Sequence, residues 1–336
     1  MKQPYFWKAA LGTIAGVMLA TPVLAEQWKF AIEEIPGSIM DSYAQEFKQR
    51  IESATDGEVT VAIYPLGSLG TPTEVAEQTA DGIVQFSNLS VGNLGTLVPE
   101  SQILLTPYAF PSDTAEVDRI LQTSETLNGD LAAAFETKGL KLGALYSEGP
   151  MVWTTKKPVH KPEDLRNFKM RVMVSPLLLK AYEDLGASPT PVPFGEVYGA
   201  LQLGQVDGQV NPLPAIEEMK FYEVSNYLIW AGESDLITAI LISDDWFQTQ
   251  SAERQELIEE TLRETNEYIG PIAARFNEER LEKIKEAKPD IELIELDEEE
   301  RAAFRERAEA TKAAIGQVVS QDAADMFEKL QAEIGQ

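Results

Sequence analysis

The feature that most constrains the fold of this chain is a regular alternation of strand and helix patterns that begins near residue 28. Short apolar runs predict the strands. Ser38 and Thr71, each followed three residues later by an acid, predict where helices begin. The predicted order is strand 28–32, helix 38–51, strand 59–63, helix 71–82 and strand 84–89. Strands separated by helices are typical of an α/β fold with a mostly parallel sheet.

A second α/β unit is predicted to begin near Met151. It contains further short apolar strands and helices in the same rhythm, and Ser175-Pro176 marks the start of its first helix. The predicted elements are strand 152–155, strand 169–174, the helix after Ser175, strand 188–191, helix 196–203, strand 208–211 and strand 239–242. The chain therefore has the pattern of two α/β units in succession.

The tail of the chain is rich in charged helical sequence. Residues 252–287 predict one helix, broken only at Gly270-Pro271. Such a helix spans ~50 Å, more than one small domain, so we expect it to cross both units with a kink at Pro271. A coiled-coil arm is the alternative, but the apolar positions keep no strict heptad. After an interruption at 291–296, Asp297 is predicted to cap a last helix that runs nearly to the end.

The first 25 residues have the pattern of an export signal. Lys2 and Lys8 precede an apolar stretch over 9–20, which is too short for a membrane span, and cleavage is expected after Ala25. An uncleaved anchor is the alternative. The chain has no cysteine, so it has no disulfide, no thiolate metal site and no cysteine for lipid attachment.

The charge of the chain argues against a nucleic-acid partner. The formal net charge is −27, with 55 acidic and 28 basic residues. Phosphate groups would be repelled by such a chain. Adaptation to a salty habitat and an ordinary acidic exported protein both account for this balance.

Catalytic signals are weak. The one histidine, His160, lies in a polar, proline-rich stretch, and the sequence contains no phosphate-binding loop, nucleophile elbow or zinc-protease motif. The acidic run at 297–300 fits the start of a helix, where negative charge is favourable. We therefore predict no enzyme activity, no cofactor and no metal.

Arg171 is the strongest candidate for a binding residue. It lies within an apolar strand, where a permanent charge is costly unless an anion meets it. From the pattern alone, an external ligand and an internal salt bridge to Glu196 or Asp207 are equally consistent. Asn211 ends a strand, at the place where α/β sheets bind ligands, but it also fits a turn before Pro212. Phe194 fits either a ligand contact or a core residue.

These residues lie in segments that together resemble a known family, the C4-dicarboxylate-type solute-binding proteins of TRAP transporters. No single segment is decisive, but their order and spacing are specific, and the resemblance covers the whole mature chain. The segments are LGSLG at 66–70, KPEDL at 161–165, KMRV at 169–172, PFGEVY at 193–198, ALQ at 200–202, VDGQ at 206–209 and FYEV at 221–224.

The resemblance implies a two-domain, periplasmic-binding-protein fold with hinge strands, a long helix spanning both domains and a ligand between them. With residues 1–25 as the signal peptide, the first domain is expected at 26–148 plus 237–276. The second is expected at 149–236 plus 277–336.

The resemblance also implies the binding residues. The arginine of the K-x-R-V strand, Arg171, is expected to hold a ligand carboxylate, with Asn211 as a further contact and Phe194 as a pocket wall. By a looser alignment, Ser90, Asn93 and Glu34 should face the cleft from the other domain. Many family members have a second arginine where this chain has Met151, so a ligand with one acid group fits better than a dicarboxylate. Met151 and Trp153 are then expected to form an apolar or aromatic wall. Trp153 fits the core equally well.

The function that the resemblance implies is capture of a small organic acid in the periplasm and its delivery to the membrane permease subunits of a TRAP transporter. We expect a monomer. A sensor partner that presents the same class of ligand to a receptor is the alternative.

Overall fold

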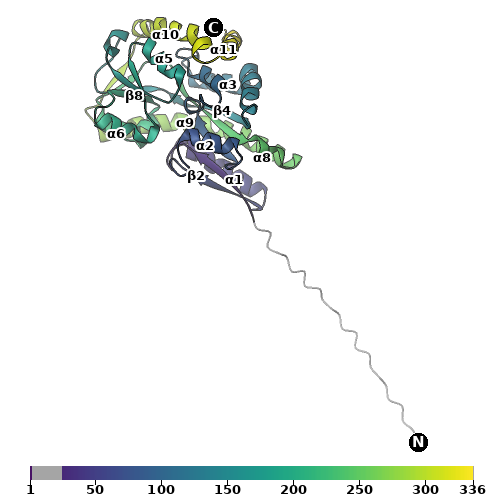
Figure 1. Ribbon diagram of the computed structural model, residues 1–336. Coiled ribbons are helices and arrows are strands. Elements are labelled where there is room, and N and C mark those ends of the chain that lie inside the picture. The colour runs from purple at the N-terminus through teal and green to yellow at the C-terminus, as the bar shows by residue number, and fades with distance from the viewer. Residues whose placement is uncertain (2–24, 336) are drawn as a thin grey trace.

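The chain folds around two β-sheets placed side by side (Figure 1). The computed structural model describes Met1 and residues 25–335. Residues 2–24 of the expected export signal lie outside the described residues. The first sheet has the strand order β2-β1-β3-β10-β4 and the second β11-β9-β5-β8-β6-β7. The strands are β1 (Glu26–Ile32), β2 (Val59–Tyr64), β3 (Phe86–Ser90), β4 (Leu140–Pro150), β5 (Val152–Thr155), β6 (Lys169–Val172), β7 (Ser188–Pro191), β8 (Gly208–Asn211), β9 (Tyr227–Trp230), β10 (Asp235–Ser243) and β11 (Glu292–Glu295).

Helices cover both sheets. The α-helices are α1 (Ile39–Ala54), α2 (Pro72–Ala80), α3 (Thr114–Thr123), α4 (Ala132–Glu136), α5 (Pro176–Asp184), α6 (Val197–Gln202), α7 (Leu213–Glu218), α8 (Asp244–Gln248), α9 (Ala252–Ala287), α10 (Glu298–Val318) and α11 (Gln321–Ile334). Shorter 3₁₀ segments include η1 (Val91–Asn93), η2 (Pro99–Leu105), η4 (Pro162–Leu165), η5 (Phe194–Glu196) and η6 (Phe221–Val224), and η3 (Thr126–Leu131) is a π-helical segment.

The predicted α/β order of the first unit is confirmed, but the first sheet is mixed rather than mostly parallel. Strand β1 pairs in parallel with β2 and β3, whereas β10 pairs antiparallel with both β3 and β4. Only β10 therefore runs against the other strands, and β10 and its neighbour β4 are the strands that connect the first sheet to the second. The elements β5 to β9 of the second sheet lie between them along the chain.

Local capping determines where the helices begin. The Ser38 hydroxyl accepts a hydrogen bond from the Asp41 amide at 3.1 Å, and Thr71 forms a reciprocal capping box with Glu74. The prediction of one final helix after Asp297 is wrong. The chain leaves the helical conformation at Val319, and the Ser320 hydroxyl then caps a separate helix, α11, by accepting from the Ala323 amide at 3.0 Å.

Helix α11 returns from α10, which packs on α5 in the second half, to η2 and η3 in the first, and three further segments also pass between the halves. Strand β4 continues into β5 at Met151, and β9 leads into β10 through residues 231–234. These two connections touch, because the Met151 amide donates to the Ser234 carbonyl at 2.9 Å. The third segment is α9, which packs on α1 and β4 in the first half and on α7 in the second. It is one helix with Pro271 inside it, as predicted.

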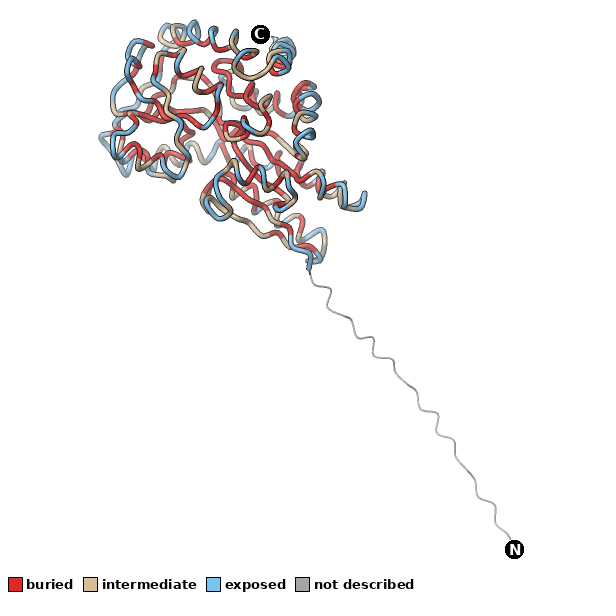
Figure 2. The backbone as a smooth tube through the Cα atoms, in the orientation of Figure 1, coloured by how far each residue is buried: buried red, intermediate tan, exposed pale blue. Residues whose placement is uncertain are grey.

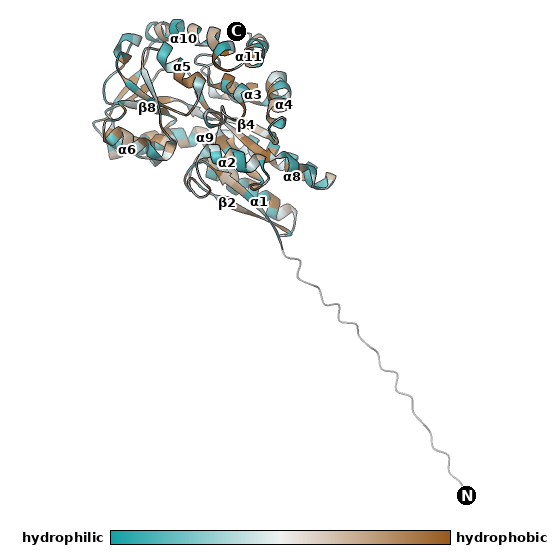
Figure 3. Ribbon diagram, in the orientation of Figure 1, coloured by the Kyte–Doolittle hydropathy of each residue, from teal (hydrophilic) through white to brown (hydrophobic). Residues whose placement is uncertain are grey.

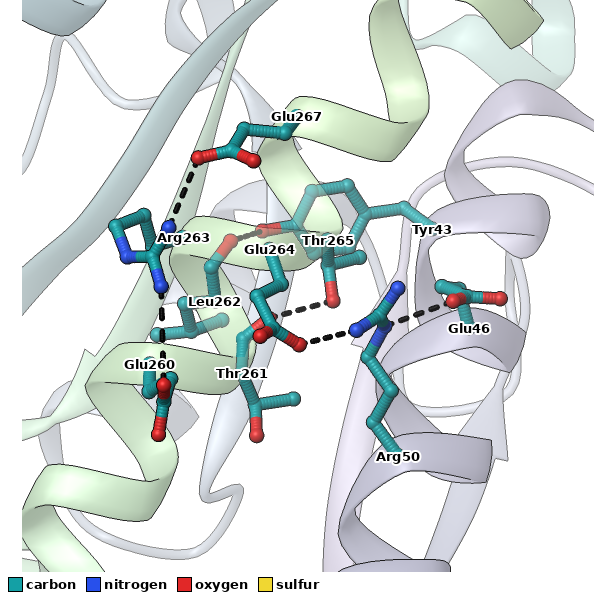
Figure 4. Close-up of polar contacts among 10 residues, drawn as sticks. All are labelled: Tyr43, Glu46, Arg50, Glu260, Thr261, Leu262, Arg263, Glu264, Thr265 and Glu267. Atoms are coloured by element: carbon teal, nitrogen blue, oxygen red, sulfur yellow. Dashed lines mark hydrogen bonds and ion pairs between the residues drawn. The ribbon is translucent and has the colours of Figure 1, made fainter.

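Polar contacts fix α9 on α1 (Figure 4). The Tyr43 hydroxyl donates to the Leu262 carbonyl at 3.3 Å. Arg50 contacts Glu46 on its own helix at 2.7 Å and also pairs with Glu264 of α9. These contacts, together with the buried apolar side chains beneath them, attach the N-terminal half of α9 to the first sheet.

The buried residues follow the strands and the inner faces of the helices (Figure 2), and the same segments are the apolar ones (Figure 3). In the first half, an aromatic cluster of Trp28, Phe30, Phe47 and Phe86 packs between the sheet and α1. Among the residues that the structure describes, no helix combines the length and hydropathy that crossing a membrane requires. The apolar surface is thus used to build the two cores.

Candidate functional site

A small cavity lies between the two sheets, and both contribute to its walls. The first-sheet wall comes from the segment after β1, the end of β3 and η1, and the second-sheet wall comes from β6, η5 and the end of β8. The lining residues are Glu33, Glu34, Ser90, Asn93, Arg171, Met173, Phe194, Asn211 and Leu236. Six of the eight residues predicted from the sequence are therefore brought together here.

Arg171 is buried without an acidic partner. The residue is 2% exposed, and its strand neighbours Met170 and Val172 are fully buried. Its Nε donates to the Val192 carbonyl at 2.9 Å, which fixes the plane of the guanidinium. Within residues 25–335, no carboxylate lies within 4.0 Å of its nitrogens, so the structure contains neither of the salt bridges, to Glu196 or Asp207, that the sequence left open. The two terminal nitrogens remain available to the cavity.

Asn211 and Phe194 complete the second-sheet wall. The Asn211 amide donates to Gln209 at 2.5 Å, and Gln209 in turn donates to the Thr154 hydroxyl at 2.9 Å, so the amide is held in one orientation. One face of Phe194 lines the cavity, while its ring packs edge-on against Phe221 at 6.0 Å. Phe194 thus lies between the cavity and the core, and its contact with a ligand stays a prediction.

The first-sheet wall is a hydrogen-bonded group of polar side chains. Asn93 donates to Glu33 at 3.1 Å and to the Ser90 hydroxyl at 3.1 Å. Glu34 accepts from the Met40 amide at 3.4 Å, at the N-terminus of α1. A helix N-terminus favours a negative charge, so the first turn of α1 orients the Glu34 carboxylate.

Burial shifts the pKa values of the charged groups in both walls. It lowers the pKa of Arg171 to about 10, an effect that nearby Glu33 opposes. It raises the pKa of Glu33 to about 7 against the hydrogen bonds from Ser90 and Asn93, and it also raises the pKa of Glu34. At neutral pH the second-sheet wall is therefore cationic, and the first-sheet wall carries two acids that resist full ionisation.

A second small cavity adjoins the first and shares Arg171, Met173 and Leu236 with it. Met151 lines this second cavity. Trp153 lines neither: it is fully buried, and its indole N–H donates to Glu233 at 2.5 Å. The structure thus places Trp153 in the core, one layer behind the wall.

The two walls are in contact at one edge. The Ser90 hydroxyl lies 3.4 Å from the Met173 sulfur, across the boundary between the halves. Gly92 packs so closely that a Cβ atom at this position would lie 2.4 Å from the Met173 methyl group. A larger residue at 92 would displace the Met173 side chain, so the glycine allows the walls to meet.

Several lining residues were missed in the sequence. Glu33 is next to Glu34 at the end of a strand, where period-two alternation gives them opposite faces, yet both reach the cavity because the chain turns there. Met173 and Leu236 looked like ordinary core residues, and Glu233 lies in a loop without a pattern. His160 is exposed and lines neither cavity; its Nδ1 lies 2.8 Å from Glu300. Across residues 25–335, no three His, Asp or Glu side chains gather as metal ligands.

The chain is similar to bacterial proteins that bind solutes outside the cytoplasm. Residues 30–317 match the family described as "Bacterial extracellular solute-binding protein, family 7". It is 35% identical over 322 residues to the ectoine/5-hydroxyectoine-binding periplasmic protein of Ruegeria pomeroyi, covering 95% of this chain and 94% of that one. It is 30% identical over 297 residues to the C4-dicarboxylate-binding periplasmic protein of Rhodobacter capsulatus, covering 88% of each.

The fold is also similar to solved structures. The periplasmic ectoine-binding protein of the TeaABC TRAP transporter of Halomonas elongata superimposes with a TM-score of 0.89 at 35% identity, covering 92% of this chain and 99% of that one. The fold of this chain thus occurs in a protein of known structure.

Proposed function

Because this chain belongs to the family of bacterial extracellular solute-binding proteins, family 7, and is the solute-binding subunit of a TRAP transporter, we propose that its ligand is a small zwitterionic organic acid. The observation that carries the proposal is the charge of the cavity. One arginine without an acidic partner faces two buried acids without a basic partner.

The carboxylate of the ligand is assigned to Arg171. A guanidinium offers two parallel donors to a carboxylate, and both terminal nitrogens of Arg171 are available. Asn211 adds a neutral polar group beside it, and Phe194 covers the body of the ligand. Met151 stands where a second arginine would serve a second acid group, which argues against a dicarboxylate.

The cationic end of the ligand is assigned to Glu34, with Glu33 beside it. Burial makes an unpaired carboxylate costly, so a positive group that enters the cavity stabilises the ionised form. Ser90 and Asn93 orient Glu33 for this contact. Ectoine, a zwitterion that is named as the ligand of relatives at 35% identity, fits this distribution of charge.

Capture is assigned to a hinge motion between two domains, 26–148 plus 237–276 and 149–236 plus 277–336. The touching connections at Met151 and Ser234 support a hinge there. Closure excludes water, which strengthens the contacts of Arg171. We assign the protein to the periplasm, as a monomer that delivers its ligand to the permease subunits of the transporter.

The test is titration calorimetry of the purified mature protein with ectoine, 5-hydroxyectoine, succinate and glucuronate. We expect the two zwitterions to bind at least tenfold more tightly than the net anions, a difference of roughly 1.4 kcal/mol. Equal or tighter binding of the net anions would overturn the assignment of the cationic end to Glu34.

A further inference from the structure

Glu148 is a buried acid with no role in the proposed contacts. It lies two residues before the end of β4, next to the connection at Met151. It is fully buried, and within residues 25–335 neither of its carboxylate oxygens has a hydrogen-bond partner. The Asn277 amide of α9 reaches only its backbone carbonyl, at 2.7 Å. A fully buried carboxylate without a partner is costly, so the group requires an explanation.

The Glu148 carboxyl lies beside the carboxyl of Glu34 in the interior. The two side chains are placed to hydrogen-bond with each other, which requires a proton on one of them. Glu34 holds the other end of this contact on the cavity wall, where the Met40 amide also donates to it at 3.4 Å. The pair therefore links the cavity directly to the connection between the two halves.

The surroundings of the pair add further negative charge. Glu33 lies beside Glu34, and Glu218 of α7 faces the pair from the second half. Arg280 of α9, a basic group on this side of the pair, is already engaged, since it lies 3.2 Å from Glu218 and donates to the Gly37 carbonyl at 3.3 Å.

Tyrosines close the side of the pair that faces the first sheet. Tyr146 of β4 stacks on Tyr43 of α1 at 5.3 Å, and its hydroxyl accepts from Asn88. Burial raises the pKa of both tyrosines, so neither is ionised at neutral pH. No group among these supplies a positive charge to the Glu34–Glu148 pair.

We propose that Glu148 and Glu34 share one proton in the ligand-free protein, and that a cationic group on the ligand enters the cavity in exchange for it. The inference rests on the proposed zwitterionic ligand. Two adjacent carboxyls retain one negative charge between them, and a cation beside Glu34 allows both to ionise. Glu148 is thus a positioning residue: it holds Glu34 in place and keeps the empty cavity closer to neutral.

The exchange gives binding a defined dependence on pH. Binding of a zwitterion releases a proton, so its affinity rises with pH over the range in which the pair is protonated, by at most about tenfold per pH unit. A net anion has no cation to offer and leaves the proton in place. Its affinity therefore does not gain from a rise in pH, and the pair acts as a filter that prefers zwitterions.

The experiment measures proton release directly. Ectoine is titrated into the full mature protein by calorimetry between pH 5 and 8, in buffers with different enthalpies of ionisation. We expect about one proton released per ectoine in the wild type. In Glu148→Gln the side-chain amide keeps a hydrogen bond to Glu34 but has no proton to lose, so release should fall towards zero. Asp184→Asn, at a half-buried acid on α5 that pairs with Lys180 and lines neither cavity, should release as much as the wild type.

A ligand-free measurement separates this inference from the proposed ligand. The pH dependence of urea unfolding reports how many more protons the folded chain binds than the unfolded chain. In Glu148→Gln this difference between the folded and unfolded chains should be smaller by about one proton. Failure of ectoine to bind the wild type overturns the zwitterion proposal. Binding without proton release, release that persists in Glu148→Gln, or an unchanged unfolding dependence in that variant each overturns the shared proton.

Discussion

The two walls of the cavity differ in charge and in how they are held. The second-sheet wall is cationic, and Arg171 is fixed there by one bond to the Val192 carbonyl. The first-sheet wall is acidic, and its side chains are held by one another and by the N-terminus of α1. No ion pair joins Arg171 to the acids across the cavity, within the described residues. Arg171 and the two glutamates therefore line the same cavity without forming a salt bridge, which leaves both kinds of charge for a ligand that carries both.

The largest effect should come from removing the cationic wall. Arg171→Ala is expected to weaken ectoine binding by about 100-fold or more, or roughly 3 kcal/mol, because the carboxylate would lose its charged partner in a buried site. Arg171→Lys should recover only part of this loss, since an ammonium cannot make two parallel bonds. Calorimetric dissociation constants decide the matter, and a near-normal value for the Ala variant rules out this residue as the anchor.

Neutralising the acidic wall should have a selective effect. Glu34→Gln is expected to weaken ectoine binding by about tenfold or more, because the cation loses its charged acceptor while the shape is kept. Binding of a net anion such as succinate should not weaken. Titrations of both ligands into the same variant give the ratio, and a parallel loss for both would mean that Glu34 only supports the fold.

The buried acids in and around the two cavities also predict how stability depends on pH. Burial raises the pKa of Glu33 to about 7, of Glu233 to about 7 and of Glu218 to about 8, so the folded chain binds more protons than the unfolded chain above the ordinary glutamate pKa. Stability without ligand should therefore fall as pH rises from 5 to 8, by about 1–3 kcal/mol, as these protons are lost. Thermal unfolding across this range measures it.

The matched control for this pH effect is a variant in which one acid of the first-sheet wall is replaced. Glu33→Gln should reduce the slope and leave the Glu233 and Glu218 contributions in place. A stability that rises steadily over pH 5 to 8 in both proteins contradicts the raised pKa values.

The smallest effect should come from contacts that hold the walls together without ligand. Arg280 lies 3.4 Å from Glu217 and 3.2 Å from Glu218 in the second half, and it donates to the Gly37 carbonyl in the first. Arg280→Ala should shift the ligand-free protein towards an open form, by about 1 kcal/mol or less. Small-angle scattering should show a larger radius of gyration, whereas Arg275→Ala, at an exposed pair on the same helix, should not.

The second-sheet wall was predictable from the sequence, and much of the first-sheet wall was not. Arg171 stood out because a charge inside an apolar strand has few explanations, and Asn211 stood out because it ends a strand. Glu34 was placed only by resemblance, and Glu33 and Glu148 gave no signal, since acids are common in a chain with 55 of them. Their importance comes from burial, which long-range packing of α1, β4 and α9 determines.

The same distinction holds for the fold. Capping residues and apolar periodicity located most elements, because these signals act over a few residues. The antiparallel pairing of β10 with β3 and β4 joins segments more than a hundred residues apart in the case of β3, and no local pattern encodes it. The break at Val319 was missed because Ser320 caps a helix that continues the same composition.

The proline inside α9 bears on how long a ligand stays bound. Pro271 has no amide hydrogen, so the Glu267 carbonyl lacks its usual partner, at the middle of a long helix that packs on both halves. If the halves separate, α9 has to bend, and the missing hydrogen bond near its centre makes the helix easier to bend. The bending stiffness of α9 affects the free-energy barriers for opening and for closing alike. We therefore expect Pro271 to set the residence time of the ligand more than its equilibrium affinity.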